Sequence, residues 1–248
     1  MRRIWTVCAG CLVIGLWAVV AFGQQATEQA GARPRIVSTE PKIGASDVDP
    51  GLKEISITFD QDMAESYSWT GGGELYPKTT GKPTWKGKRT CALPVQLEPG
   101  QFYRVGINAG QKFSGFRSAQ GVPTATWAIW FTTQGASAEL VAKLQQPKIV
   151  SSVPQIGDQA VDANLSEIRV TFDQEMGGGF SLTGSGPSHP TGTGQTRWDE
   201  TKRTLIWPVK LEPNHEYRFG VNSFSFKNFS SAYGVPVSPV LFQFKTRP

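Results

Sequence analysis

The chain of 248 residues repeats one long pattern, and this repeat constrains its fold more than any other feature. The segment ITFDQDM at 57–63 returns as VTFDQEM at 170–176. The two copies are offset by 113 positions at their start, from Pro34 to Pro147. A period of this length has the size of a whole domain and is too long for a solenoid repeat. The sequence therefore predicts two similar domains in tandem.

The repeat and the composition around it divide the chain into predicted segments. Ser137 can cap a short helix that carries Leu140, Val141 and Leu144 on one side, so the connection between the copies is expected to set their relative angle. In order, the segments are a signal peptide (1–23), a flexible lead-in (24–33), a first domain (34–133), a linker (134–146) and a second domain (147–248).

The first residues have the pattern of a targeting segment. Arg2 and Arg3 precede an uncharged apolar run at 4–22, and Ala21 and Gly23 stand three and one positions before the expected cut. This pattern predicts export to a periplasm or to the outside of the cell. The alternative is a retained transmembrane anchor, because the apolar run is nearly long enough to span a bilayer.

Within each copy, apolar and polar residues alternate with a period of two. Ile55, Ile57 and Phe59 alternate with Ser56 and Thr58, for example. Several such short segments are separated by turns rich in Gly, Pro and Asp, and none shows a helical pattern. The predicted fold class is therefore all-β, with each copy forming an antiparallel β-sandwich.

A sequence motif shared by both copies predicts a specific corner of such a sandwich. LEPGQFY at 97–103 returns as LEPNHEY at 211–217. The Pro-containing turn leads into a strand that starts near Tyr103 or Tyr217, whose hydroxyl can bond an upstream backbone group. This resembles the tyrosine corner of Ig-like and fibronectin-like sandwiches, so each copy is predicted to be an Ig-like β-sandwich and both tyrosines are predicted to be structural.

The charge and cysteine content exclude several classes of protein. The net charge of +5 includes two arginines of the predicted signal peptide, so the exported chain is only mildly basic and nucleic-acid binding is not expected. Cys91 is the one cysteine outside that segment, which rules out an intrachain disulfide and favours a role as an apolar filler. His189 and His215 have no recognisable nucleophile motif around them. The sequence predicts no catalytic residue, no cofactor and no metal.

Four acids directly follow a strand in the two copies, at Asp60, Asp62, Asp173 and Glu175. They could bind Ca²⁺ or act as the carboxylate pair of a glycosidase. The alternative is structural: Asp60 and Asp173 would bond backbone N–H groups, and Met63 and Met176 beside them would plug the end of each sandwich. Their presence in both copies favours the structural interpretation.

Trp130 is the main candidate for a contact with a ligand or partner. The alternation of its strand points it outward, and the second copy has Gln243 at the same place. An exposed tryptophan could stack on a sugar, with Lys86 and Arg89 of the basic stretch at 78–89 as further contacts. The alternative, which we favour, is that Trp130 packs under the linker or against the other domain.

The motifs together resemble a known family. P-x-x-G-A-x-D-V at 41–48, ITFDQDM, L-E-P-G-x-x-Y and the closing WFTT at 130–133 follow one another as in the bacterial Ig-like domain of the S-layer SbsA type. The resemblance implies an extracellular β-sandwich module of S-layer proteins, or an accessory module of secreted enzymes and adhesins. The sequence shows no S-layer homology segment, which would attach such a protein to a wall.

These observations lead to three hypotheses of function. The first is a secreted, non-catalytic spacer or adhesion module of the cell envelope or extracellular space. The second is a carbohydrate-binding module that uses Trp130 and the basic stretch, and the third is a glycoside hydrolase built on the paired acids. The expected partner is an extracellular protein or polysaccharide. The exported chain is expected to be monomeric, without a membrane span.

Overall fold

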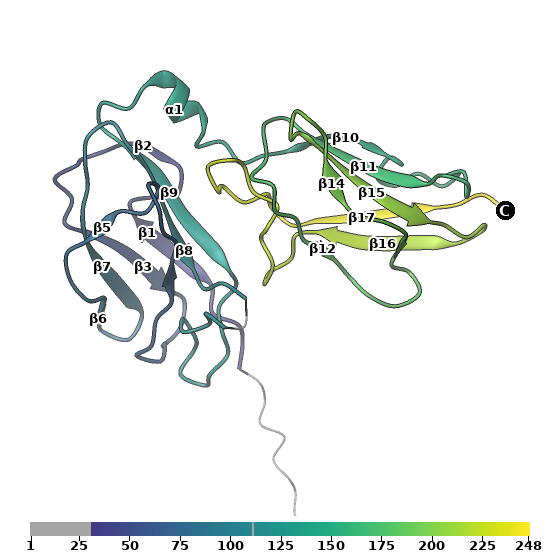
Figure 1. The fold of residues 1–248 in the computed structure, drawn as a ribbon. Helices are drawn as coiled ribbons and strands as arrows, with labels where there is room; N and C mark the ends of the chain where they lie inside the picture. The colour runs from purple at the N-terminus through teal and green to yellow at the C-terminus, as the bar shows by residue number, and fades with distance from the viewer. Residues whose placement is uncertain (1–30, 111) are drawn as a thin grey trace, which may run out of the picture. The chain divides into compact units, whose positions relative to one another are not determined.

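The computed structural model describes residues 31–110 and 112–248, which form two tandem β-sandwiches joined by a short helix (Figure 1). The predicted signal peptide and its anchor alternative lie outside the described residues. Among the residues that are described, no helix combines the length and apolar character needed to cross a membrane.

The first sandwich has nine strands in two sheets. One sheet has the order β1-β3-β7-β5, with β6 also paired to β7, and the other has the order β2-β9-β8-β4. All its pairs are antiparallel except β2–β9, which is parallel. The strands are β1 (Ile36–Glu40), β2 (Ala45–Val48), β3 (Glu54–Phe59), β4 (Trp69–Thr70), β5 (Lys78–Thr79), β6 (Thr84–Lys86), β7 (Thr90–Gln96), β8 (Phe102–Ile107) and β9 (Trp127–Thr133).

The second sandwich repeats this topology after the helix α1 (Ala138–Ala142). Its sheets have the orders β10-β11-β15-β13, with β14 also on β15, and β12-β16-β17. The parallel pair is reduced to one bridge between Val161 and Thr246. The strands are β10 (Ile149–Val153), β11 (Glu167–Phe172), β12 (Leu182–Thr183), β13 (Thr191–Gly192), β14 (Arg197–Trp198), β15 (Thr204–Lys210), β16 (Glu216–Val221) and β17 (Val240–Lys245).

The alternation in the sequence determines which side chains enter the cores. In β3, Ile55, Ile57 and Phe59 are buried while the residues between them are partly exposed, as a period of two requires. The predicted plugs Met63 and Met176 are both buried and belong to the two cores. The all-β prediction is confirmed.

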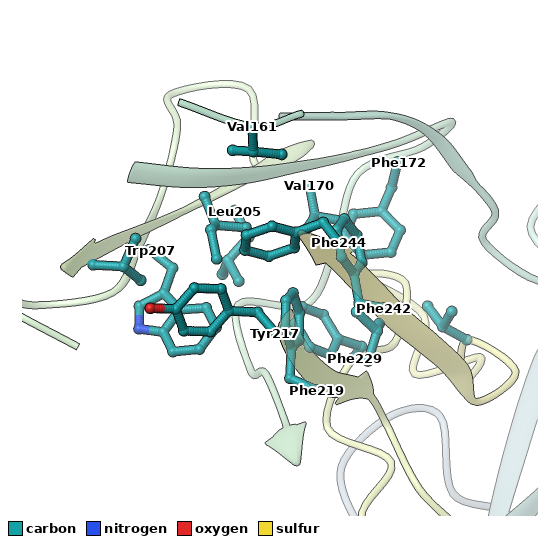
Figure 2. Close-up of a cluster of buried hydrophobic side chains, with 14 of the residues drawn as sticks. Val161, Val170, Phe172, Leu205, Trp207, Tyr217, Phe219, Phe229, Phe242 and Phe244 are labelled. Atoms are coloured by element: carbon teal, nitrogen blue, oxygen red, sulfur yellow. The ribbon is translucent and has the colours of Figure 1, made fainter. Parts of the chain in front are cut away.

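Aromatic rings fill much of the second core (Figure 2). Phe219 of β16 stacks on its cross-strand neighbour Phe242 of β17, with 4.6 Å between ring centroids. Tyr217 and Phe244, the next pair that points inward, lie 5.2 Å apart. Such pairs add to the apolar area that they bury, so they help to fix the register of β16 against β17.

The tyrosine corner forms in both copies as the shared motif predicts. The Tyr103 hydroxyl accepts a hydrogen bond of 2.9 Å from the Glu98 N–H, and the Tyr217 hydroxyl accepts one of 2.7 Å from the Glu212 N–H. Both tyrosines are buried, while Glu98 and Glu212 are exposed, so each bond satisfies a hydroxyl that has lost most of its contact with water.

Removing either hydroxyl is expected to destabilise its own sandwich. Tyr103→Phe and Tyr217→Phe should each lower the free energy of unfolding by about 1 kcal/mol, because each removes a part-buried hydrogen bond to the backbone. Urea denaturation followed by circular dichroism measures this change. Tyr67→Phe at the exposed Tyr67 is the control and should have no effect. Unchanged stability in both corner variants would show that these bonds do not hold the fold.

Candidate functional site

The first acid of each pair bonds a residue that directly precedes the first strand of its sandwich. The Asp60 carboxylate accepts hydrogen bonds from the Arg35 backbone N–H at 2.9 Å and from its Nε at 2.8 Å. In the second copy, Asp173 accepts from the Lys148 N–H at 2.9 Å. These bonds to Arg35 hold the pKa of Asp60 below its usual value. The two aspartates therefore bond backbone N–H groups, although these lie 25 residues upstream and not in the adjacent turn.

The other acid of each pair contacts a different cation. Asp62 accepts from Arg89 Nε at 2.8 Å, and this bond lowers the pKa of Asp62. Glu175 lies 3.5 Å from Lys202 Nζ. A glycosidase acid needs a raised pKa, so the lowered values of Asp60 and Asp62 argue against that role. Among the described residues, no group of three or more His, Cys, Asp or Glu could hold a metal ion.

The basic stretch at 78–89 is partly neutralised by neighbouring side chains. Lys86 forms an ion pair with Glu54 of β3, and Arg89 pairs with Asp62. These contacts are exposed, so each contributes little to stability. They do reduce the positive charge that Lys86 and Arg89 could offer to an anionic polymer.

Trp130 is buried under the linker, in agreement with the alternative interpretation of its outward position, and it is not exposed as a ligand contact would require. Only 3% of its surface is exposed, and its Nε1 donates a hydrogen bond of 2.9 Å to the Leu144 carbonyl. The alternation does send it out of the first core, but the linker covers that face of the sheet. The predicted helix forms there, with the Ser137 Oγ accepting from the Leu140 N–H at its start. Trp130 therefore has no free face on which a sugar could stack.

The outward face of β8 and β9 belongs to a third apolar cluster, which includes residues of both sandwiches and the linker. We call it the junction cluster. Phe102 packs edge-on against Tyr233, with 5.2 Å between ring centroids, and Arg104 Nε donates to the Gly234 carbonyl at 2.7 Å. Burial lowers the pKa of Arg104. The buried members are Phe102, Ala128, Trp130, Leu144 and Val235, and the partly buried ones are Ile43, Leu75, Trp127, Leu140, Val141 and Tyr233.

A pocket of about 660 Å³ lies beside this cluster, and we call it the junction pocket. The Thr126 N–H donates to the Phe224 carbonyl at 3.1 Å, which ties the two segments that border the pocket. Its walls come from residues 33–36, from Thr124, Ala125 and Trp127, and from the loop around Phe224. Its lining residues are Arg33, Pro34, Arg35, Ile36, Thr124, Ala125, Trp127, Phe224, Lys227 and Pro239.

Lys227 is an ionisable residue that lines the junction pocket beside two aromatic rings. Its Nζ lies 4.8 Å from the ring centroid of Trp127 and 6.0 Å from that of Phe224. Desolvation lowers the pKa of Lys227 to about 8. The sequence reasoning missed this site. Two features of the sequence could have indicated the site. Trp127 stands where the second copy has Val240, and the aromatic residue Phe224 lies three positions before Lys227.

The two histidines, which have no recognisable nucleophile motif around them in the sequence, line one small pocket at the second sandwich. His189 packs against Trp207, and His215 packs against Tyr217 and contacts the Pro187 carbonyl through Nε2 at 3.0 Å. Cys91 is buried, and this burial raises the pKa of its thiol to about 11. A thiol with a raised pKa is a poor nucleophile, which suits the filler role.

No protein-family model and no curated protein matches this chain. Among solved structures, a tandem of titin Ig domains is similar at 11% identity and a TM-score of 0.24, covering 86% of this chain and 96% of that one. The S-layer protein SbsC is similar at 16% identity and a TM-score of 0.27, covering 87% of this chain and 26% of that one. Titin domains in complex with telethonin are similar at 9% identity and a TM-score of 0.24, covering 87% of this chain and 95% of that one.

Proposed function

We propose that this chain is a non-catalytic Ig-like tandem of the S-layer SbsA type, which acts outside the cell as a structural spacer or interaction module. In this proposal residues 1–23 direct export, residues 34–133 and 147–248 are the two domains, and residues 134–146 fix their relative pose. The junction cluster is the observation that carries the proposal. A spacer transmits position or force only if its modules do not swing freely.

The contacts in the junction cluster favour such a fixed pose. Separating the sandwiches would expose Phe102, Tyr233 and Val235 to water. It would also break the bond between Arg104 and the Gly234 carbonyl. Domains of one chain are expected to move unless their interface is hydrophobic and well packed. The apolar character of this interface therefore supports a stiff connection.

Arg104 provides a direct test, because the repeat supplies a matched control. Arg104→Ala should remove a charge-assisted hydrogen bond worth about 1.5–3 kcal/mol and loosen the junction. Arg218 occupies the same place in the second copy, but it is exposed and pairs with Glu216. Arg218→Ala should therefore leave the junction intact.

Small-angle X-ray scattering measures the outcome. The unmodified protein and the Arg218→Ala variant should each fit a single conformation, while Arg104→Ala should require a broad ensemble. The proposal of a fixed spacer fails if the unmodified protein already requires such an ensemble. It also fails if both arginine variants scatter like the unmodified protein and hydrogen exchange shows that the backbone amides at the junction are unprotected in all three proteins.

A further inference from the structure

The junction pocket has the size and the lining of a small-molecule site. Its volume of about 660 Å³ lies within the range of ligand pockets, roughly 300–1,000 Å³. Ile36, Trp127, Phe224 and Pro239 line it with apolar surface. Phe224 is 70% exposed, which is unusual for a large aromatic residue with no covering element.

The charges around the pocket are predominantly positive. Within the described part of the chain, Lys227 has no carboxylate partner, although its Nζ lies over Trp127. Arg33 donates through one nitrogen to the Pro123 carbonyl, and its other donors have no described acceptor. Arg35 also lines the pocket, but it is paired with Asp60. An anion would therefore find two cations that no acid neutralises.

The hydrogen-bonding groups of the wall are mostly used already. The Thr124 hydroxyl donates to the Pro34 carbonyl at 2.8 Å, and the Thr126 N–H is bonded to Phe224. A sugar needs many polar partners for its hydroxyls, and these residues do not supply them. A flat apolar ligand with one anionic group matches the wall and the charge better.

We propose that the junction pocket binds a small aromatic carboxylate, whose ring packs against Trp127 and Phe224 and whose carboxylate pairs with Lys227, assisted by Arg33. This site goes beyond the spacer function, because a rigid connection between sandwiches needs no ligand. A bound ring would contact residues of both sandwiches at once. The ligand would therefore add to the stability of the junction by binding only the joined form.

The probe for this proposal is 1-naphthoate, with binding measured by isothermal titration calorimetry on the exported chain. Lys227→Met keeps the length of the apolar side chain and removes the charge. It should weaken naphthoate binding by about tenfold or more, as expected for the loss of a charged partner. Lys227→Arg should restore most of the affinity. The neutral analogue 1-naphthalenemethanol should bind the unmodified protein and the Lys227→Met variant equally.

Lys112→Met is the matched control. Lys112 lies over Phe113, at 5.7 Å from its ring centroid, in the corresponding loop of the first copy, but it does not line the junction pocket. This variant should bind naphthoate like the unmodified protein. Thermal melting of each variant confirms that it folds.

The pH dependence gives a second readout. Lys227 must be protonated to pair with a carboxylate, and its pKa is lowered to about 8, so affinity should fall as the pH rises from 7 to 9. The other charged residues at the pocket are Arg33 and Arg35, and Arg35 is paired with Asp60. The proposal is overturned if naphthoate does not bind at millimolar concentration, or if Lys227→Met binds it unchanged. It is also overturned if neutral oligosaccharides displace naphthoate from the pocket.

Discussion

Replacing Trp130 with alanine is expected to lower the free energy of unfolding of the first sandwich by about 3–5 kcal/mol, the usual cost of truncating a buried tryptophan. The indole is 3% exposed and packs in the junction cluster. Its removal leaves a cavity and also leaves the Leu144 carbonyl without its donor. Guanidinium denaturation measures the stability, and hydrogen exchange should show lost protection across the linker at 134–146.

Gln243→Ala is the control for this substitution. Gln243 stands at the same strand position in the second copy, on β17, where it bonds Glu216 at the surface. Its removal should change stability by less than about 0.5 kcal/mol. If Trp130→Ala proves as mild as Gln243→Ala, the junction cluster does not hold the linker against the first sandwich.

Asn222→Asp is expected to destabilise the second sandwich by about 2–6 kcal/mol at neutral pH. Asn222 is buried, and its Nδ2 donates to the carbonyls of Phe229 and Val237, both at 2.9 Å. Its Oδ1 accepts from the Phe229 N–H at 3.0 Å. An aspartate has the same shape but cannot donate when ionised, so two buried carbonyls lose their partners at about 1–3 kcal/mol each.

The sign of the pH dependence distinguishes this effect from a loss of packing. The ionised carboxylate is disfavoured beside two carbonyl oxygens, so the folded variant is expected to have an aspartate pKa above the unfolded value of about 3.9. The stability of the variant should therefore be highest at low pH and fall as the pH rises through that value. Urea denaturation between pH 3 and pH 7 measures this trend relative to the unmodified protein.

Asn214→Asp is the matched control for Asn222→Asp. Asn214 also has a positive φ, 51° against 63° for Asn222, but it lies exposed in the turn before β16. The change should cost less than about 0.5 kcal/mol. A similar cost at both positions would mean that backbone conformation, and not the buried amide, is responsible. Asn108 makes the equivalent bonds in the first sandwich.

The two copies differ at the residues that form the junction, and this difference was visible in the sequence. Phe102 and Trp130 of the first copy are replaced by Glu216 and Gln243 in the second. The outward face of β8 and β9 is therefore largely apolar, while the corresponding face of β16 and β17 carries Glu216, Arg218 and Gln243 beside the exposed Leu241. Such a contrast between repeats indicates a covered face. It does not say what covers the face, and for this reason Trp130 was open to two interpretations.

The sandwich fold, the tandem arrangement and the tyrosine corner followed from the sequence alone. Alternation of apolar residues, turn residues and the Tyr103 motif act over a few positions, so the chain itself records them. The junction cluster, the environment of Lys227 and the partners of Asp60 were decided only by the tertiary structure. Arg104 and Gly234, for example, are 130 positions apart. Contacts between residues so far apart in the sequence depend on how the two folded sandwiches pack, and no local pattern of residues determines that packing.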